Sequence, residues 1–384
     1  MNKILIVTPF SPYPAMHGGK VDIWNNIKVL KELGFKIDLI ITEKNVNLTD
    51  GSKKEISKYV SKVILVERKN MLKDIFSLHP LQIESRKSLK NIILKDKYDF
   101  TLLEGDYVAY ILENNTLTTK QLLLRSQNNE IKYFYNLFKS TNKIINKLYY
   151  FTEFIKFKLF VPQLYANIRN ILFISCDEKK YFCENFKNLN AVFLPANVNL
   201  DLKKQALDTN SVLFIGSLFM ENNKEGILWY LENVHAIISK NIRSYKLIIA
   251  GNSDGTDLRW LLDFKNIFNN IEIFDSPETL DKLYKASSVF INPMRHGAGV
   301  KLKTVEAIVN GLPVVSTSIG NEGTGLTNDK EIIVRDDKIA FAEATVNLLR
   351  DNELKRNLVN SAQKYIKENY NTKEILKRYL ENLK

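Results

Sequence analysis

Apolar and polar residues follow one another along the chain in blocks that predict alternating strands and helices. Short apolar runs with little polar interruption lead into turns, and then into segments whose apolar residues recur every three or four positions. Such runs are typical of parallel strands buried on both faces, and the mixture predicts an α/β fold. The expected strands are residues 3–8, 35–42, 63–66, 97–103, 121–125, 171–174 and 191–194, then 212–215, 246–250, 271–274, 288–292, 312–317 and 331–334.

A polar stretch over residues 201–210 separates the two groups of strands and predicts two domains. We place the boundary so that the first domain is residues 1–203 and the second is residues 204–370. The 384 residues, 45% of them hydrophobic, are enough to form two cores. The clearest helical segments are residues 20–33, 280–286, 340–350, 353–370 and 372–383.

A glycine-bearing loop after the strand at 288–292 carries the clearest chemistry. Glycine lets the backbone approach a ligand, and the free N–H groups at the start of the next helix point toward it. Arg295 and Lys301 add two positive charges, so the loop is typical of an anion site such as one for a diphosphate. Glu306, in the body of the helix, has the spacing to meet the same ligand, where a carboxylate suits a sugar hydroxyl. The other candidate ligand-binding residues of the loop are His296, Gly297, Ala298, Gly299 and Val300.

This stretch resembles the donor-binding segment of retaining glycosyltransferases of family four, which have GT-B architecture. The matching residues are Pro293, Gly297, Gly299, Lys301, Lys303, Glu306, Ala307, Gly311, Pro313, Val314, Val315, Ser316 and Thr317. Much of the family has a further glutamate, separated from Glu306 by seven residues, where this chain has Ala298. The resemblance implies two Rossmann-like domains that face each other across a deep cleft. It also implies that the C-terminal helix, within residues 371–384, crosses back to the first domain.

The same resemblance adds donor-binding residues in both domains. The opening of the second domain, residues 216–229, follows the pattern of the family branch, with a Gly-Ser turn that would face a phosphate. Relatives hold the nucleobase with backbone groups near residues 273–275 and bracket the sugar or nucleotide from a later turn. Paired glycines at the head of the first helix would meet the diphosphate with backbone amides. The implied residues are Gly18, Gly19, Gly216, Ser217, Asn223, Lys224, Ile273, Phe274 and Glu322.

Residues for an acceptor are expected in the first domain. Glu104 stands at the end of a predicted strand, and the carboxyl end of a parallel strand faces the ligand crevice. The segment 125–130 resembles the family's R-S-H-N-V-E, with Asn128 and Glu130 in register. The histidine position is Gln127, which can hydrogen-bond but cannot exchange a proton as histidine does.

The sequence predicts chemistry without a metal or other cofactor. Its four histidines are scattered, and no Asp-x-Asp stands in a loop after a strand to hold a metal-bound diphosphate. Protein cations and amides would then stabilise the leaving group. We assign catalytic roles to Arg295 and Lys301, which would neutralise the departing nucleoside diphosphate, and to Glu306, which would hold the ribose. His17 and His296 stand in the two glycine loops, either as phosphate contacts or as structural hydrogen-bonding groups.

Residues 131–160 contain ten aromatic residues, six lysines and a single acid, Glu153. Lys139, Lys143 and Lys147 are four positions apart, which predicts one stripe on a helix. Either the segment forms two helices with an ordinary solvated lysine face, or it contacts an anionic membrane surface. The net charge of +12 is compatible with anionic partners and does not choose among them.

Three functions fit these residues. A sugar transferase would extend a surface polysaccharide, such as capsule or lipopolysaccharide, from a nucleotide-sugar donor onto a glycan or lipid-linked acceptor, with no nucleic acid as partner. A sugar-nucleotide epimerase would need acidic and histidine groups that Ala298 and Gln127 do not supply, and those two substitutions favour a non-catalytic nucleotide-binding scaffold. No apolar run reaches the roughly 18 residues of a membrane span. The first residues predict a strand and no signal peptide, so we expect a cytoplasmic protein or one on the inner face of the plasma membrane.

Overall fold

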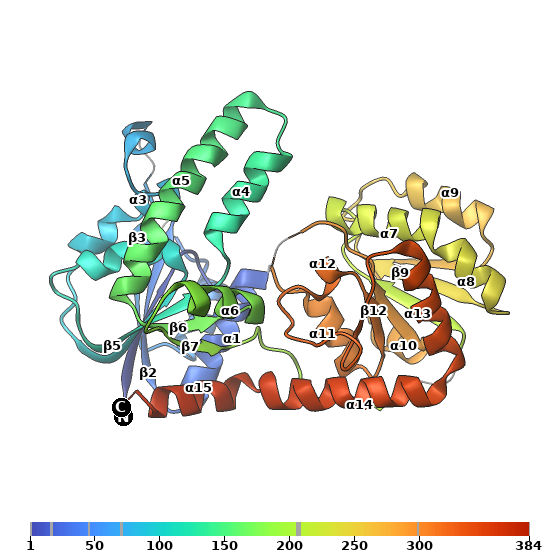
Figure 1. Cartoon of the computed structure of the whole chain (residues 1–384). Helices are drawn as coiled ribbons and strands as arrows, with labels where there is room; N and C mark the ends of the chain where they lie inside the picture. The colour runs from blue at the N-terminus through green and yellow to red at the C-terminus, as the bar shows by residue number, and fades with distance from the viewer. Residues whose placement is uncertain are drawn as a thin grey trace. The chain divides into compact units, whose positions relative to one another are not determined.

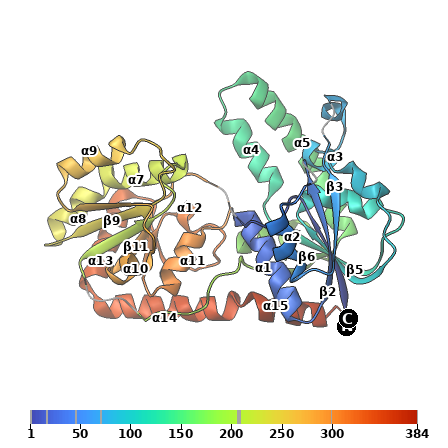
Figure 2. The same cartoon turned by 180° about the vertical axis from the view of Figure 1, so that it is seen from behind.

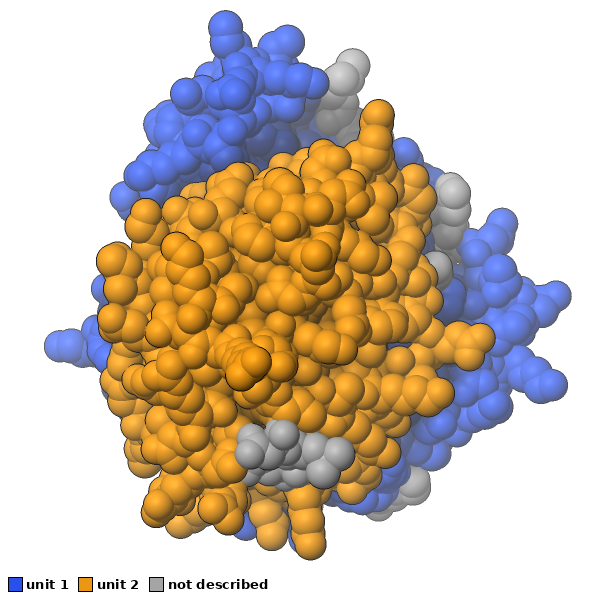
Figure 3. Space-filling model, turned by 90° about the vertical axis from the view of Figure 1, so that its right-hand side faces the viewer, with its two compact units in different colours: residues 1–197, 372–384 blue, residues 198–371 orange. Residues whose placement is uncertain are grey.

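Each half of the chain forms a parallel β-sheet with helices on its faces (Figures 1 and 2). The computed structural model describes residues 2–15, 18–44, 47–69, 72–204, 209–297 and 299–383. The chain divides into unit 1, Met1–Asn197 with Thr372–Lys384, and unit 2, Val198–Asn371, which Figure 3 colours separately. The predicted α/β class with two Rossmann-like domains is confirmed.

The described residues of unit 1 form a seven-stranded parallel sheet in the order β3-β2-β1-β4-β5-β6-β7. The strands are β1 (Lys3–Thr8), β2 (Lys36–Glu43), β3 (Lys62–Glu67), β4 (Lys97–Glu104), β5 (Thr118–Ser126), β6 (Asn170–Phe173) and β7 (Asn190–Phe193). The helices are α1 (Gly18–Glu32), α2 (Asp50–Ser57), η1 (Leu72–Phe76), α3 (Leu81–Glu84), η2 (Lys87–Asn91), η3 (Asp106–Glu113), α4 (Glu130–Ser140), α5 (Ile144–Asn167), α6 (Cys176–Asn185) and α15 (Thr372–Glu381). Every strand predicted for this half is present, with ends within three residues of the predicted ones.

The described residues of unit 2 form a six-stranded parallel sheet in the order β10-β9-β8-β11-β12-β13. The strands are β8 (Ser211–Ile215), β9 (Lys246–Gly251), β10 (Ile271–Asp275), β11 (Val289–Asn292), β12 (Val314–Ser316) and β13 (Ile333–Val334). The helices are α7 (Glu221–Asn233), α8 (His235–Asn241), α9 (Arg259–Ile267), α10 (Asp281–Lys285), α11 (Leu302–Val309), α12 (Ser318–Asn321), α13 (Lys338–Arg350) and α14 (Asn352–Asn369). Strand β12 begins later than predicted because Pro313 has no N–H to donate to the ladder. No helix among the described residues has the length and apolar character needed to cross a bilayer.

In each sheet the strand order reverses next to the first strand of the unit. Strand β1 lies between β2 and β4, and β8 lies between β9 and β11. At such a switch point the connections leave on opposite faces and open a crevice at the carboxyl ends of the two strands, where doubly wound folds bind ligands. The topology therefore marks one candidate site in each unit.

Between β5 and β6, helices α4 and α5 form an antiparallel hairpin that projects from the sheet (green in Figure 1). Aromatic pairs hold its two helices together, with ring centres 5.1 to 5.3 Å apart in Phe134–Phe157, Tyr135–Phe154 and Phe138–Phe151. The chain turns at residues 141–143, so that Lys139 lies on α4, Lys147 lies on α5, and Lys143 precedes α5. The predicted lysine stripe on a single helix is therefore wrong, because the three lysines flank the turn of a hairpin.

The C-terminal helix α15 belongs to unit 1, although α14 immediately before it belongs to unit 2. Leu376 and Leu380 are buried in the same core cluster as Trp24 of α1. The hydroxyl of Tyr379 donates a hydrogen bond to the carbonyl of Asn190 at 2.6 Å. These contacts confirm that the last helix packs on the first domain.

Candidate functional site

The turn between β8 and α7 lies at the switch point of unit 2. Gly216 and Ser217 form this turn, and Asn223 lies in the first turn of α7. Asn223 is buried, and its Nδ2 donates to the Ser217 carbonyl at 2.9 Å. Its Oδ1 accepts a hydrogen bond from the ammonium of Lys303 at 2.5 Å. Three residues that the sequence predicts for one site are thus together, with a cation that sequence reasoning did not assign to the site.

Lys303 reaches the turn from α11. A Cβ atom at Gly216 would lie 2.8 Å from the Lys303 ammonium nitrogen, so glycine leaves the space that the cation fills. The ammonium also lies 4.7 Å from the centre of the Phe214 ring. Burial, with a smaller effect of the Lys301 charge, lowers the pKa of Lys303 to about 7. An anionic ligand would raise this pKa again, so the group is suited to binding one.

The loop between β11 and α11 adopts the backbone that its glycines predict. Gly297 and Gly299 have φ angles of 125° and 82°, which side chains rarely permit. Lys301 is 5% exposed, and its ammonium donates to the Gly299 carbonyl at 2.6 Å and lies 3.5 Å from the carboxylate of Glu322. Two predicted charged residues from separate turns therefore meet at the start of α11.

Arg295, in the same loop, is held by different partners. Its Nη1 donates to the carbonyl of Asp336 at 3.0 Å, and its guanidinium carbon lies 4.9 Å from the centre of the Trp229 ring. Trp229, on α7, is partly buried against the core of unit 2. The guanidinium is thus fixed at the rim of the loop, and His296 beside it is exposed.

Neither α7 nor α11 begins with a side-chain cap. The residues before them are Met220 and Lys301, and neither side chain accepts a hydrogen bond from the first turn. Helix α13, in contrast, is preceded by Asp337, whose carboxylate accepts hydrogen bonds from two backbone amides of its first turn. Helix starts without a cap at the carboxyl end of a sheet are suited to an anion, which can take the place of the cap.

The end of β10 carries the predicted nucleobase contacts. Ile273 is half-buried and Phe274 is 37% exposed, so this edge of the sheet is accessible. Asp275 accepts hydrogen bonds from the amide and the hydroxyl of Ser253 at 2.9 and 2.7 Å. These bonds tie the loop after β9 to the end of β10.

Two charged residues predicted for the donor lie outside the Gly216 cluster. The ammonium of Lys224 lies 5.8 Å from the centre of the Trp260 ring and 4.0 Å from a carboxylate oxygen of Glu221. Glu306 follows Lys303 by about one turn of α11 and is exposed. The lysine that lies at the Gly216 turn is Lys303.

A buried polar cluster lies at the switch point of unit 1. Glu104, the last residue of β4, is fully buried, and the Gln127 amide donates to it at 3.0 Å and to Asp22 at 3.2 Å. Arg125 makes two 3.0 Å hydrogen bonds to the Asp22 carboxylate, and the amide of Asn26 lies 3.4 Å from both carboxylates. Burial, and next the charge of Asp22, raise the pKa of Glu104 to about 7.

The remaining acceptor-side residues form a neighbouring pair. Glu130, the first residue of α4, accepts a hydrogen bond from the Tyr107 hydroxyl at 2.7 Å and one from Asn128 at 3.5 Å. Burial raises the pKa of Glu130 to about 7. Gly18 opens α1, and a Cβ atom there would meet no atom within 4 Å. The packing therefore leaves open space beside the first amides of α1.

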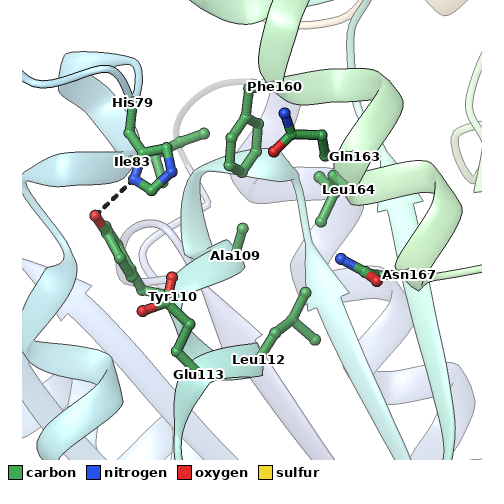
Figure 4. A pocket seen from close by; sticks show the side chains of 10 residues that line it. All are labelled: His79, Ile83, Ala109, Tyr110, Leu112, Glu113, Phe160, Gln163, Leu164 and Asn167. Carbon is green, nitrogen blue, oxygen red and sulfur yellow. Dashed lines mark hydrogen bonds between the residues drawn. The ribbon is translucent and has the colours of Figure 1, made fainter.

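Unit 1 also contains a cavity of about 150 Å³ between α3, η3 and α5, away from these residues (Figure 4). The Tyr110 hydroxyl donates to the Glu84 carboxylate at 2.6 Å, so Nδ1 of His79 must donate in its 2.7 Å bond to Tyr110. The residues that line the cavity are His79, Ile83, Ala109, Tyr110, Leu112, Glu113, Phe160, Gln163, Leu164 and Asn167. None of them belongs to the predicted site.

Comparison with known proteins identifies the family. Residues 209–351 match the family model described as Glycosyl transferases group 1. An "Uncharacterized 44.6 kDa protein in cps region" of Klebsiella pneumoniae is 37% identical over 387 residues, which cover 98% of each chain. The chain belongs to the glycosyltransferase group 1 family. Membership of this family supports a role in sugar transfer.

A more distant relative of the glycosyltransferase has a named reaction. The GalNAc-alpha-(1->4)-GalNAc-alpha-(1->3)-diNAcBac-PP-undecaprenol alpha-1,4-N-acetyl-D-galactosaminyltransferase of Campylobacter jejuni is 24% identical over 223 residues, 54% of this chain and 60% of that one. Among solved structures, S. aureus TarM in complex with fondaparinux, alpha-GlcNAc-glycerol and UDP has a TM-score of 0.65 at 12% identity, over 100% and 99% of the two chains. Anabaena HepE in complex with UDP and glucose has a TM-score of 0.62 at 11% identity, over the same shares. These likenesses confirm the GT-B fold.

Within the glycosyltransferase, the structure gathers many of the predicted residues and adds others. Gly216, Ser217 and Asn223 share one cluster, and Lys301 meets Glu322. Sequence reasoning gave no site role to five further residues, each of which has a hydrogen-bond partner at least 23 positions away in the chain: Asp22, Asn26, Tyr107, Arg125 and Lys303. Ala298 and His17 lie outside the described residues. Among the described residues, no three His, Cys, Asp or Glu side chains are grouped so that they could hold a metal ion.

Proposed function

We propose that this glycosyltransferase moves a hexose-type sugar from a nucleoside-diphosphate sugar to a glycan or lipid-linked acceptor, with retention of configuration and without a metal ion. The observation that carries the proposal is the cation cluster at the switch point of unit 2. Lys303 stands at the Gly216 turn with a lowered pKa, and Lys301 follows the glycine loop at the start of α11. Two lysines beside two uncapped helix starts provide the charge that a diphosphate needs.

The proposed chemistry depends on the stabilisation of a leaving group. When the bond between the sugar and the diphosphate breaks, negative charge builds up on the departing phosphate oxygen. Lysine ammonium groups and helix amides that are already in place would stabilise this charge without reorganisation, which is usually the largest catalytic effect in such transfers. Arg295 would add a planar cation at the rim, and Glu306 would accept hydrogen bonds from the ribose hydroxyls. In retaining relatives the departing phosphate is thought to take the proton of the acceptor hydroxyl on the same face, and we extend that role to this chain.

Unit 1 would supply the acceptor side. Gln127 and Asn128 are amides beside carboxyl groups whose pKa is raised to about 7, so the region can exchange hydrogen bonds with sugar hydroxyls near neutral pH. The cps-region relative and the relative named for an undecaprenol-linked acceptor support a role in surface polysaccharide synthesis. A lipid-linked acceptor would keep the enzyme in the cytoplasm, at the inner face of the plasma membrane.

The proposal is tested with the full chain and a panel of nucleotide sugars. We expect one nucleoside diphosphate to raise the melting temperature and the matching nucleotide sugar to be hydrolysed slowly without an acceptor. A charge-paired contact to a diphosphate is worth about 1.5 to 3 kcal/mol. Arg295→Ala and Lys301→Ala should therefore each weaken nucleotide binding about tenfold or more, whereas Lys265→Ala on exposed α9 should not.

Each other outcome has a clear meaning. Conversion of the donor to an isomeric sugar would replace transfer by epimerisation, and binding without any turnover would indicate a scaffold. Unchanged affinity in both the Arg295 and the Lys301 variants would remove the assignment of these residues.

A further inference from the structure

The tip of the α4–α5 hairpin carries apolar side chains that none of the described residues of unit 1 covers. Ile144 and Ile145 are each 84% exposed and Leu148 is 66% exposed, all in the first two turns of α5. Aromatic residues pack between the two helices of the hairpin, whereas Ile144, Ile145 and Leu148 remain exposed. Contiguous exposed apolar side chains on a folded protein mark a surface that contacts something else.

A second apolar projection lies on the same side of unit 1. Figures 1 and 2 both show the blue segment with η1 and the green hairpin projecting in the same direction. Phe76 is 90% exposed and Leu78 is 87% exposed. The ammonium of Lys156 on α5 donates to the carbonyl of Ile75 at 2.9 Å, which fixes this segment against the hairpin. The two projections therefore lie on one side of unit 1, and we call their exposed apolar residues together the apolar tip surface: Phe76, Leu78, Ile144, Ile145 and Leu148.

The exposed charges beside the hairpin turn have one sign. Lys139, Lys143 and Lys147 flank the hairpin turn and are exposed. The single acid in residues 131–160, Glu153, is 1% exposed, accepts a hydrogen bond from the Leu81 amide and pairs with Lys156 at 3.4 Å. Solvent therefore meets lysine ammonium groups and apolar side chains, with no carboxylate of this segment between them.

This combination separates the possible occupants. A second copy of the chain would bring one lysine-rich tip against another, and like charges at short range oppose such a contact. A nucleic acid would use the lysines but not the isoleucines and Phe76. An anionic lipid surface uses both, because its phosphates attract lysines while its acyl chains accept apolar side chains.

We propose that the apolar tip surface and its three lysines dock the enzyme on anionic phospholipid bilayers. Ile144, Ile145 and Phe76 enter the boundary between head groups and acyl chains, and the lysines stay among the phosphates. The contact goes beyond the sugar-transfer site, since all of its residues belong to unit 1 and none belongs to the predicted donor or acceptor groups. Its placement on the cytoplasmic leaflet rests on the proposed function, whereas lipid binding itself does not.

The test is co-sedimentation of the full chain with vesicles. One set of vesicles contains phosphatidylcholine alone, and the other contains phosphatidylcholine with phosphatidylglycerol. We expect binding to the anionic vesicles at least about tenfold tighter than to neutral ones, and weakened by salt. The triple variant Ile144→Ser, Ile145→Ser, Leu148→Ser should bind the anionic vesicles about tenfold more weakly or worse.

Two matched controls use unit 2. Leu262 and Ile267 on α9 are 45% and 70% exposed, and changing both to serine should leave vesicle binding unchanged. A second tip variant replaces all three lysines, and it should abolish the preference for anionic vesicles: Lys139→Gln, Lys143→Gln, Lys147→Gln. The same change at three exposed lysines of unit 2 should not: Lys240, Lys265 and Lys285.

Several results would overturn the proposal. These are absence of binding to either kind of vesicle, full binding by both tip variants, or self-association that the serine variant abolishes, which would make a second copy the occupant. Nucleoside diphosphate binding, measured by thermal shift on the same variants, should not change. Lipid binding without nucleotide binding would contradict the proposed function alone. Nucleotide binding without lipid binding would contradict this inference alone.

Discussion

The Lys303 ammonium is unfavourable without a ligand, because burial disfavours its charged form. Its ammonium is held by one neutral acceptor, Asn223, while Lys301 lies close enough to oppose its charge. Lys301 itself is close to the carboxylate of Glu322. The carboxylate of Glu306 offsets the effect of burial on Lys303 only in part, and a diphosphate beside Lys303 would supply a further counter-charge. Ligand binding should therefore be coupled to proton uptake by Lys303.

This coupling predicts a pH dependence of donor affinity. A nucleotide sugar keeps a constant charge near neutrality, so any change in its affinity reports on the protein. In the free enzyme the Lys303 cation is present below its pKa of about 7 and is lost above it, whereas the bound diphosphate raises the pKa. The dissociation constant should then rise about tenfold from about pH 6 to about pH 8. Isothermal titration calorimetry measures this change.

Lys303→Met isolates the effect. The variant should bind the nucleotide sugar more weakly at low pH, and its dissociation constant should change little with pH. Lys240→Met, at an exposed lysine of the same unit, should keep the wild-type profile. A flat profile in the wild type, or an unchanged slope in the Lys303 variant, would show that Lys303 does not touch the diphosphate.

At this scale the sequence predicted residues that lie close together in the chain and missed those that meet across it. The charges and glycines of the loop at 293–301 stand in one segment, so their chemistry was visible. Lys303 and Asn223 are separated by 80 positions, and Arg125 and Asp22 by 103. No local sequence pattern predicts such pairs, because the sheet topology brings their residues together.

At the scale of elements, the turn at Gly216 and Ser217 depends on how closely the carboxyl ends of β8 and β9 approach each other. A Cβ atom at Gly251 would lie 1.8 Å from the carbonyl oxygen of Gly216, so the two strand ends can meet only if residue 251 is glycine. Gly251→Ala should push the Gly216–Ser217 turn away from Asn223. We expect a loss of about 1 to 3 kcal/mol in the free energy of unfolding, together with weaker nucleotide binding. Urea denaturation and thermal shift measure the two effects.

Gly51→Ala is the matched control for this variant. Gly51 lies in α2, and a Cβ atom there would meet nothing within 4 Å. Because alanine favours a helix, this change should leave stability equal or raise it slightly, by less than about 1 kcal/mol. Wild-type stability in the Gly251 variant would mean that the strand ends separate without cost.

Strands were easier to predict than helices for a physical reason. A parallel strand covered on both faces is apolar throughout, so the inner strands of unit 1 form visible apolar runs. The partly exposed edge strand β3 still keeps the apolar run Val63 to Val66. Helix α2 contains a single large apolar residue, Ile56, and has no apolar period to detect. The α4–α5 hairpin agrees with the alternative of two helices, and only the single lysine stripe is wrong. Its turn, Thr141 to Lys143, carries no glycine or proline, and the lysine spacing continues through it.

For the whole molecule, the apolar pattern predicted two halves but not which distant segments join them. Residues 198–204 lie with unit 2, since the Lys203 amide donates to the Val309 carbonyl at 2.8 Å and Gln363 donates to the Lys203 carbonyl at 2.8 Å. The sequence placed the boundary after residue 203, where polarity rises. Helix α15 shows apolar residues at Leu376, Tyr379 and Leu380, a stripe that requires a partner without identifying it. Only the family resemblance indicated that the partner is the first domain.

The position of α15 leads to a prediction for a chain that ends at Asn371. The truncation uncovers Trp24 and removes Leu376, Tyr379 and Leu380, which are at most 7% exposed. Loss of this packing should lower the free energy of unfolding of unit 1 by about 3 kcal/mol or more. Unit 2 should keep its stability and its nucleotide binding, because none of the lost side chains belongs to its core.

Hydrogen exchange followed by mass spectrometry, which reports on each strand, should therefore show faster exchange in β1, β2 and β7 and unchanged exchange in β8, β9 and β11. Lys377→Ala with Glu381→Ala, at two exposed positions of α15, should change neither set. If β1 and β7 keep their protection after truncation, α15 does not stabilise unit 1, and the packing of Leu376 and Leu380 must contribute nothing to the stability of that core.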